Sequence, residues 1–555
     1  MSGLTTLVAR RSVLEYVRRP LNVVLLVVVP VVIVVAWGGA LADFSKVILG
    51  GTGDRAQIEV AAAGWATAAL AGLAGFFQVS GSGSADRRLA AASGSSDQIV
   101  AGRMTAALGL SLVAAIGGLV ALAARSGIAD PIRAGAGTAM VAVIYLALGM
   151  LVGTFVRSEM NGALVVTLVW VFDVFFGPAL GPNASMVTRF FPLHFPTLVL
   201  IGQSSGHGGT FGDVGWSLVW TIGLVSLAAV RLRIVTRPAA RAIARADATS
   251  SVAQPTPIPR SDAHADPAST SAAGRLVAPT SRAALSTERP GTGDRLTAVI
   301  RAGMREHRRN RVLWALLVAV PAVFIGMAVM VTVDSPGPIK LVERSRHFVA
   351  YLSERRIHAA TMVPITAAFL AGITGLFVVT ESSGGDRRLV LAGFRTREVL
   401  AGRLAVIGAA TMLTTLVAVA VSGTLYPPRQ WVVFIGANLL IAMTYAMIGV
   451  LVGPITGRLG GLYLILMLAF IDVGLGQSVM FPDGPPAWGA YLPARGASQM
   501  MIDGAFTSRF DATLSMALGL AWLAALSAAA VAMFHFRAGA ATVGAQHRAA
   551  VAAVA

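Results

Sequence analysis

Apolar runs of about twenty residues recur along the whole chain, and they limit its fold more than any other feature. A run of this length crosses the ~30 Å hydrocarbon core of a bilayer as an α-helix. Hydrophobic residues make up 55% of the chain and charged residues only 13%. A soluble protein of this size needs more charge on its surface. We therefore predict an all-α integral membrane protein with twelve spans, over residues 21–38, 60–79, 104–124, 134–156, 160–180, 214–235, 312–333, 358–380, 404–424, 430–453, 459–480 and 512–536.

The basic residues predict the orientation of these spans. The net charge is +18, and it lies in short segments between the spans. With the N-terminus in the cytoplasm, 31 of the 44 Lys and Arg residues fall on the cytoplasmic side, as the positive-inside rule requires. We expect a multi-pass protein of the bacterial plasma membrane with both termini in the cytoplasm. The same distribution gives no reason to expect a nucleic acid partner.

The second half of the chain repeats the first. LAGLAGFF at 70–77 matches LAGITGLF at 370–377, and Asp86-Arg87-Arg88-Leu89 matches Asp386-Arg387-Arg388-Leu389, both at an offset of 300. Asp173 matches Asp472 at an offset of 299. Ordered matches at a nearly constant offset indicate a duplication. Because each unit has six spans, the two copies share one orientation and are related by a pseudo-twofold axis along the membrane normal.

This duplication divides the chain into four parts. We predict a first six-helix unit over 1–237, a linker over 238–293, a second six-helix unit over 294–540 and a cytoplasmic tail over 541–555. The linker is rich in Ala, Pro, Ser, Thr and Arg and lacks apolar periodicity, so we expect a disordered tether. A regulatory or lipid-binding role for its arginines is the alternative.

The cytoplasmic loop between the second and third spans is charged in both copies. It reads DRRLAAASGSSDQIVAGRM in the first and DRRLVLAGFRTREVLAGRL in the second. Anchoring of the loop by arginine explains one copy, but the repeated pattern favours a docking helix for a partner protein. The candidate docking residues are Asp86, Arg87, Arg88, Arg103, Asp386, Arg387, Arg388, Glu398 and Arg403.

A charged amphipathic segment precedes the first span of each copy. LTTLVARRSVLEYVRRP and LTAVIRAGMREHRRNRV have the spacing of a helix that lies in the membrane interface. The alternative is an ordinary basic flank. The candidate interfacial residues are Glu15, Arg18, Glu306 and Arg309.

An acidic residue lies near the external end of the fifth span in each copy. A carboxylate in the bilayer centre costs about 2.5–3.5 kcal/mol on insertion scales, so we expect Asp173 and Asp472 to have a function. They would face a translocation pathway together with Phe176, or cap a re-entrant helix in the Pro- and Gly-rich segment that follows. Capping is the preferred interpretation, and a plain external loop is the alternative to the re-entrant segment.

Several catalytic motifs are missing from the sequence. Neither Lys46 nor Lys340 lies in a Gly-rich phosphate-binding context, and there is no HExxH or GxSxG motif. The chain has no cysteine, and its eight histidines lack metal-ligand spacing. We therefore expect no enzyme activity, no cofactor and no metal in this chain.

The chain resembles the permease subunits of type-2 ABC transporters. LVLAGFRTREVLAGRL at 389–404 is similar to that family's coupling loop, with Glu398, Gly402 and Arg403 in register. The first copy keeps Gly102 and Arg103 but has Gln98 at the position of the Glu. The fused double length also resembles actinobacterial permeases described as exporters of polyketide antibiotics, of the tetronasin type. The resemblance implies export of a lipophilic compound, such as an antibiotic, drug or lipid, with two copies of a separate ATPase that bind ATP and Mg²⁺.

Two other functions fit parts of the sequence. A proton-coupled drug carrier also has twelve spans in two parallel halves, and GSADRRLAAASG at 83–94 partly matches the loop motif of such carriers. A membrane enzyme or scaffold would use Asp173 and Asp472 as a pair. An adjacent ATPase gene would favour the ABC interpretation, and transport on a proton gradient alone would favour the carrier.

Overall fold

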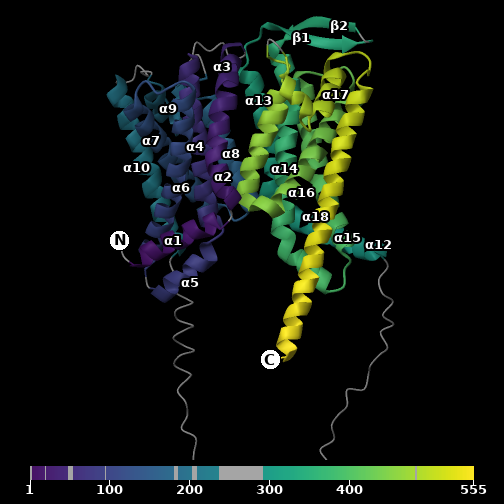
Figure 1. Ribbon diagram of the computed structural model, residues 1–555. Coiled ribbons are helices and arrows are strands. Elements are labelled where there is room, and N and C mark those ends of the chain that lie inside the picture. Colours follow the sequence, from purple (N-terminus) through teal and green to yellow (C-terminus); the bar gives the residue numbers. More distant parts are fainter. Residues whose placement is uncertain are drawn as a thin grey trace, which may run out of the picture.

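The computed structural model is a bundle of long helices in two halves that stand side by side (Figure 1). The residues that the structure describes are 3–18, 20–47, 54–93, 95–180, 186–202, 209–236, 292–344, 346–481 and 484–554. The predicted linker, 238–293, lies outside the described residues except for its last two positions. The segment predicted as a C-terminal tail continues the last helix as far as Val554.

Ten α-helices are described in the first half of the chain, with two short segments of other helix types. They are α1 (Gly3–Val17), α2 (Pro20–Val32), the π-helix η1 (Ile33–Trp37), α3 (Gly38–Val47), α4 (Arg55–Ser80), α5 (Gly83–Ser93), α6 (Ser96–Arg125), α7 (Pro131–Phe155), α8 (Glu159–Phe175), the 3-10 helix η2 (Met186–Phe190), α9 (His194–Ile201) and α10 (Gly209–Thr236).

The described second half contains long helices and one pair of strands. Its elements are α12 (Thr292–Arg309), α13 (Arg311–Val331), β1 (Pro336–Glu343), β2 (Arg346–Ser353), α14 (Glu354–Leu391), α15 (Thr396–Leu425), α16 (Trp431–Leu468), the π-helix η3 (Ala469–Gly476), the 3-10 helix η4 (Ala487–Tyr491), α17 (Arg495–Phe506) and α18 (Thr513–Val554).

Nine helices among the described residues are long and apolar enough to cross a membrane. They are α4, α6, α7, α10, α13, α14, α15, α16 together with η3, and α18. The all-α, membrane-compatible class predicted from the apolar runs is thus confirmed. A tenth span arises if α1 and the helix that begins at Pro20, which meet at 82°, are taken as one bent pair.

Four of the twelve predicted spans do not stand alone in this set. The span at 21–38 appears only in that bent pair, and the span at 160–180 corresponds to α8, which has 17 residues. The spans at 430–453 and 459–480 form one long segment that is broken at Gly457, where φ is 73°. Glycine has no Cβ, so it adopts this left-handed conformation without the steric cost that other residues incur.

Glycine contacts hold the most buried helices of each half together. α4 packs against α6, α7 and α8, and α14 packs against α13, α15 and α16. A Cβ on Gly149 would lie 1.8 Å from the carbonyl oxygen of Gly72, and one on Gly449 would lie 2.1 Å from that of Gly372. Small residues let membrane helices approach this closely. The resulting van der Waals contact stabilises helix packing in lipid, where the hydrophobic effect does not drive helices together.

The helix before the first span of each half packs on the start of the third. A Cβ on Gly102 of α6 would lie 2.8 Å from the Cβ of Val8 in α1. A Cβ on Gly402 of α15 would lie 2.4 Å from a methyl carbon of Val299 in α12. The glycine of each Ala-Gly-Arg sequence is therefore explained by the close approach of α1 or α12.

A β-hairpin covers one end of the second half (Figure 1). β1 and β2 are antiparallel, and β1 buries Ile339 and Leu341 against the bundle. The sequence predicts only a loop between the spans at 312–333 and 358–380, because the short alternation that follows Pro336 and Pro338 is a weak strand signal. The hairpin, α3 and α17 lie at one end of the molecule, whereas α1, α5 and α12 lie at the other (Figure 1).

Candidate functional site: a cavity between the two halves

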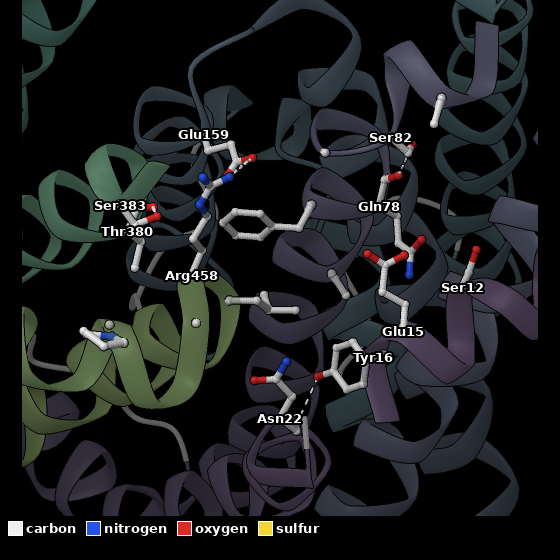
Figure 2. Close-up of a pocket in the computed structure, with 18 of the residues that line it drawn as sticks. Ser12, Glu15, Tyr16, Asn22, Gln78, Ser82, Glu159, Thr380, Ser383 and Arg458 are labelled. Atoms are coloured by element: carbon white, nitrogen blue, oxygen red, sulfur yellow. Dashed lines mark hydrogen bonds and ion pairs between the residues drawn. The ribbon is translucent and has the colours of Figure 1, made fainter. Parts of the chain in front are cut away.

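A cavity of about 1280 Å³ lies between the two halves (Figure 2). The first half lines it with α1, α2, α4, α5, α6 and α8, and the second half with α14, α16 and α18. Because α1 and α5 contribute to its wall, the cavity lies toward the end of the bundle away from the hairpin. This volume is large enough for a drug-sized molecule.

Aromatic rings close the deep end of the cavity. Phe77 of α4 lines the cavity and stacks on Phe377 of α14, with ring centroids 6.4 Å apart and planes 7° from parallel. Farther toward the hairpin end, the hydroxyl of Tyr463 donates a hydrogen bond to the carbonyl of Leu70 at 2.9 Å. Both contacts join the two halves, and both lie on the hairpin side of the cavity.

The wall of the cavity combines apolar and polar groups. Ala74, Leu110, Val379, Val450 and Leu459 provide apolar surface. The polar side chains that Figure 2 labels come mostly from the first half. They are Ser12, Glu15, Tyr16, Asn22, Gln78, Ser82 and Glu159, with Thr380, Ser383 and Arg458 from the second half.

The hydroxyl of Tyr16 donates to the carbonyl of Asn22 at 3.2 Å, which fixes the corner where α1 meets α2. This surface suits a molecule with a large apolar body and a few polar groups.

An ion pair holds the charged loop of the first half in place. Arg103 lies 2.9 Å from Asp86 through Nη2 and Oδ1, and its Nε donates to the other carboxylate oxygen at 3.3 Å. The hydroxyl of Ser82 donates to Asp86 at 2.8 Å, and Nη1 of Arg103 donates to Ser12 of α1 at 2.9 Å. This network ties α1, α5 and α6 together at the cavity wall.

The same contacts occur 300 residues farther along the chain. Arg403 lies 2.8 Å from Asp386, and Ser382 donates to Asp386 at 2.9 Å. The Asp and Arg side chains in the two pairs are only 10–15% exposed. Each pair is largely buried and is held by two charge-assisted hydrogen bonds. In the structure these four residues connect each loop to the helix that follows it.

The remaining docking candidates differ in exposure. Arg87, Arg88, Arg387 and Arg388 are exposed. Glu398 is buried and accepts a hydrogen bond from the backbone N–H of Arg395 at 3.0 Å. It therefore caps the N-terminus of α15. The pattern of charge in the sequence does not distinguish the exposed arginines from Glu398, which is buried and caps a helix.

Two of the four interfacial candidates have described side chains. Glu15 and Arg18 are exposed, and Glu15 lines the cavity. The side chains of Glu306 and Arg309, in α12, lie outside the described residues.

Asp173 and Asp472 hold short buried helices in place. Asp173 accepts hydrogen bonds from the Tyr145 hydroxyl and from the N–H of Leu193, the residue before α9. Asp472 accepts from Tyr445, Gln477 and the N–H of Ala494, which precedes α17. All eight residues of α9 are buried, as the re-entrant interpretation requires. Each Asp thus accepts a hydrogen bond from the backbone N–H just before a short helix, as the capping interpretation predicts.

Neither Asp173 nor Asp472 belongs to the lining of the cavity. Phe176, the third residue assigned to the pathway, stacks with Phe172 and Phe191 beyond the end of α8. The residues that do line the space between the halves include Phe77, Glu159 and Arg458, which the sequence analysis did not select. The match of LAGLAGFF with LAGITGLF contains Phe77 and Phe377, and it was the available signal for that pair.

Among the described residues, no group of three or more His, Asp and Glu side chains is placed to hold a metal ion. Comparison with protein-family models and with curated proteins finds no match to this chain.

Proposed function

We propose that this chain is the membrane subunit of an ATP-driven exporter, and that the cavity holds its substrate. The cavity between the halves is the observation that carries the proposal. A space of about 1280 Å³ with mixed apolar and polar walls, closed at one end by Phe77 and Phe377, is the arrangement that alternating access requires. The substrate is a lipophilic small molecule such as an antibiotic, a drug or a lipid.

The proposal includes twelve spans in two parallel six-helix repeats. Matching contacts support this arrangement, because the Asp–Arg pair, the Tyr–Asp cap and the glycine contacts each occur twice at offsets of 299 or 300. The positive-inside bias puts the end with α1, α5 and α12 in the cytoplasm of a bacterial cell. The cavity then opens toward the cytoplasm.

A separate ATPase would dock on the cytoplasmic loops. Arg87 and Arg88 on α5 and Arg387 and Arg388 on α14 are exposed, and each pair follows an Asp that is locked to the third span. Movement of the loop is therefore passed on to that span. Two copies of the ATPase, each with ATP and Mg²⁺, would serve the two loops.

The test is ATP hydrolysis by the chain and its co-expressed ATPase in nanodiscs, with hydrophobic antibiotics and lipids added in turn. We expect stimulation by at least one compound, and its loss when Arg87→Glu is combined with Arg387→Glu. The matched control, Arg346→Glu with Arg356→Glu, changes two exposed arginines at the opposite end and keeps stimulation. Normal export by the Arg87/Arg387 variant, or export driven by a proton gradient without ATP, would refute the proposal.

A further inference from the structure

Glu159 and Arg458 form an ion pair across the cavity wall. Nη1 of Arg458 lies 2.5 Å from Oε1 of Glu159, and both residues line the cavity (Figure 2). Glu159 begins α8 in the first half, and Arg458 follows the break at Gly457 in the second. The ion pair therefore joins the two halves.

The two residues occupy the same place in their respective halves. Their offset of 299 equals that of Asp173 and Asp472, so each lies fourteen residues before the buried Asp of its own half. A residue that touches its own counterpart lies on the axis relating two copies. Phe77 and Phe377 meet in the same way, as identical residues. At the position of Glu159 and Arg458, two identical copies would instead place like charges face to face.

The surroundings make each charge depend on the other. The side chain of Glu159 is only 14% exposed, and its second oxygen is buried without a hydrogen-bond partner. A buried carboxylate that loses its cation leaves an uncompensated charge. Arg458 is 38% exposed, and it lies near the N-terminus of a helical segment, where the helix dipole disfavours a cation. Glu159 offsets that disadvantage.

We propose that Glu159 and Arg458 are a latch that limits how far the two halves separate at the open end of the cavity. The proposal rests on the two-repeat arrangement proposed above. It requires the two halves to carry opposite charges at this position. Divergence after duplication produced an attraction that neither half could make with a copy of itself. Opening of the cavity beyond the described arrangement requires the pair to break.

The absence of cysteine makes the separation of the halves directly measurable. Ala92 and Ala392 are exposed residues at equivalent places near the mouth of the cavity. Cysteines at these two positions would carry spin labels, and pulsed electron resonance gives the distribution of distances between them. The measurement needs neither an ATPase nor a substrate, so it can fail or succeed independently of the proposed transport function.

Variants of Glu159 and Arg458 test whether the ion pair limits the distance between the two labels or is a contact without this effect. Glu159→Gln and Glu159→Arg are expected to lose the narrow distance component and gain a longer one. Glu159→Arg combined with Arg458→Glu restores the pair in reverse and should return the wild-type distribution. The control is Asp97→Asn with Arg233→Gln, which removes a 2.9 Å ion pair within the first half and should leave the distribution unchanged.

Unchanged distances in both Glu159 variants would overturn the latch. So would failure of the charge-reversed variant to restore the distances while its thermal unfolding matches wild type. If Glu159→Arg does not fold, Glu159→Gln decides the question, because it removes the charge without adding volume.

Discussion

The hydroxyl of Tyr463 in the second half donates a hydrogen bond to the backbone carbonyl of Leu70 in the first half, at 2.9 Å. Leu70 lies seven residues from Phe77 on α4, which is two turns or about 10 Å along the helix. The barrier above the cavity therefore has two layers, the stack of Phe77 on Phe377 and the contact of Tyr463. On the function proposed above, both contacts would open for a substrate to pass between the halves.

The first prediction concerns this barrier. Ala71 lies between the two layers and is fully buried. In the cysteine-free chain, Ala71→Cys should not react with a water-soluble maleimide. Combining it with Phe77→Ala and Phe377→Ala removes the stack, and Ala71→Cys should then react from the cavity side. Mass spectrometry of the intact chain measures the modification.

A cysteine at Ser383 is the control for access to the cavity. Ser383 is exposed and lines the cavity below the stack. It should react in both backgrounds. A barrier formed elsewhere would leave Ala71→Cys unreactive even without the two rings.

The second prediction concerns the ion pair of the second loop. Arg403→Ala leaves the buried carboxylate of Asp386 without its cation, and loss of one partner from a buried pair costs about 3 kcal/mol. Thermal unfolding in detergent should shift to a clearly lower temperature. Arg387→Ala, on an exposed neighbour, should change stability by less than about 0.5 kcal/mol. Equal shifts in the two variants would mean that the pair does not brace the loop.

The third prediction separates a cap from a transport carboxylate. Asp472 accepts hydrogen bonds from Tyr445, Gln477 and the N–H of Ala494. Asp472→Asn keeps one acceptor oxygen, whereas Asp472→Ala leaves the N–H of Ala494 unpaired, at a cost of about 1–3 kcal/mol. The hydroxyl of Tyr445 and the amide of Gln477 each keep a second, carbonyl acceptor. We expect the Asn variant to be the more stable of the two in thermal unfolding and to transport normally. Loss of transport in a stably folded Asn variant would assign the charge a direct function.

The fourth prediction uses two glycines of one helix. Gly402→Ala would place a Cβ 2.4 Å from Val299 and push α12 away from α15, at a cost of about 1–3 kcal/mol. Gly408→Ala meets nothing closer than 3.9 Å, so alanine should stabilise α15 by roughly 0.5–1 kcal/mol. Opposite shifts in the unfolding temperature are expected. A shift in the same direction would place α12 elsewhere.

The fifth prediction concerns pH and the hairpin. The hydrogen bond from the Ser508 hydroxyl holds the pKa of Glu343 below its ordinary value, and the N–H of Ser508 and nearby Arg344 act in the same direction. Because the folded pKa is lowered, this contact stabilises docking of the hairpin above the ordinary value of 4.5 and is lost as pH falls through the lowered pKa. The protection factors of the β1 amides, which correct for the pH dependence of intrinsic exchange, should fall in acid.

Glu343→Gln removes the titrating group from this contact. Its β1 exchange should be faster at neutral pH and show less acid dependence than wild type. An identical acid response in wild type and variant would assign the effect to another group.

Long elements of this fold were predictable because membrane helices need apolar length. The sequence could not show that 430–480 forms one segment broken at Gly457, because the left-handed turn depends on a single glycine among many. It also missed the hairpin, whose strands gain stability by packing β1 on the bundle. Both features depend on contacts between distant segments of the chain, which the local sequence pattern does not reveal.

The candidate site was less predictable than the fold. Charge and repetition indicated Asp86 and Arg103 as docking residues, and the structure places them in a largely buried ion pair. Glu159 and Arg458 were not predicted, because matches between the two halves were identified by identical residues and these two residues carry opposite charges. Complementary change at equivalent positions is the signal that would have found them.

The two loops also differ in how they connect to the bundle. In the first half, Gly81 and Ser82 separate α4 from α5, whereas α14 runs unbroken for 38 residues from the hairpin to the loop. A turn between two helices can bend when one of them is displaced, whereas a continuous helix moves as one unit. If the proposed ATPase moves both loops, movement of the second loop would be transmitted directly along α14 to the hairpin end, whereas movement of the first would reach α4 across the turn at Gly81 and Ser82. One half would drive the motion, and the other would follow it.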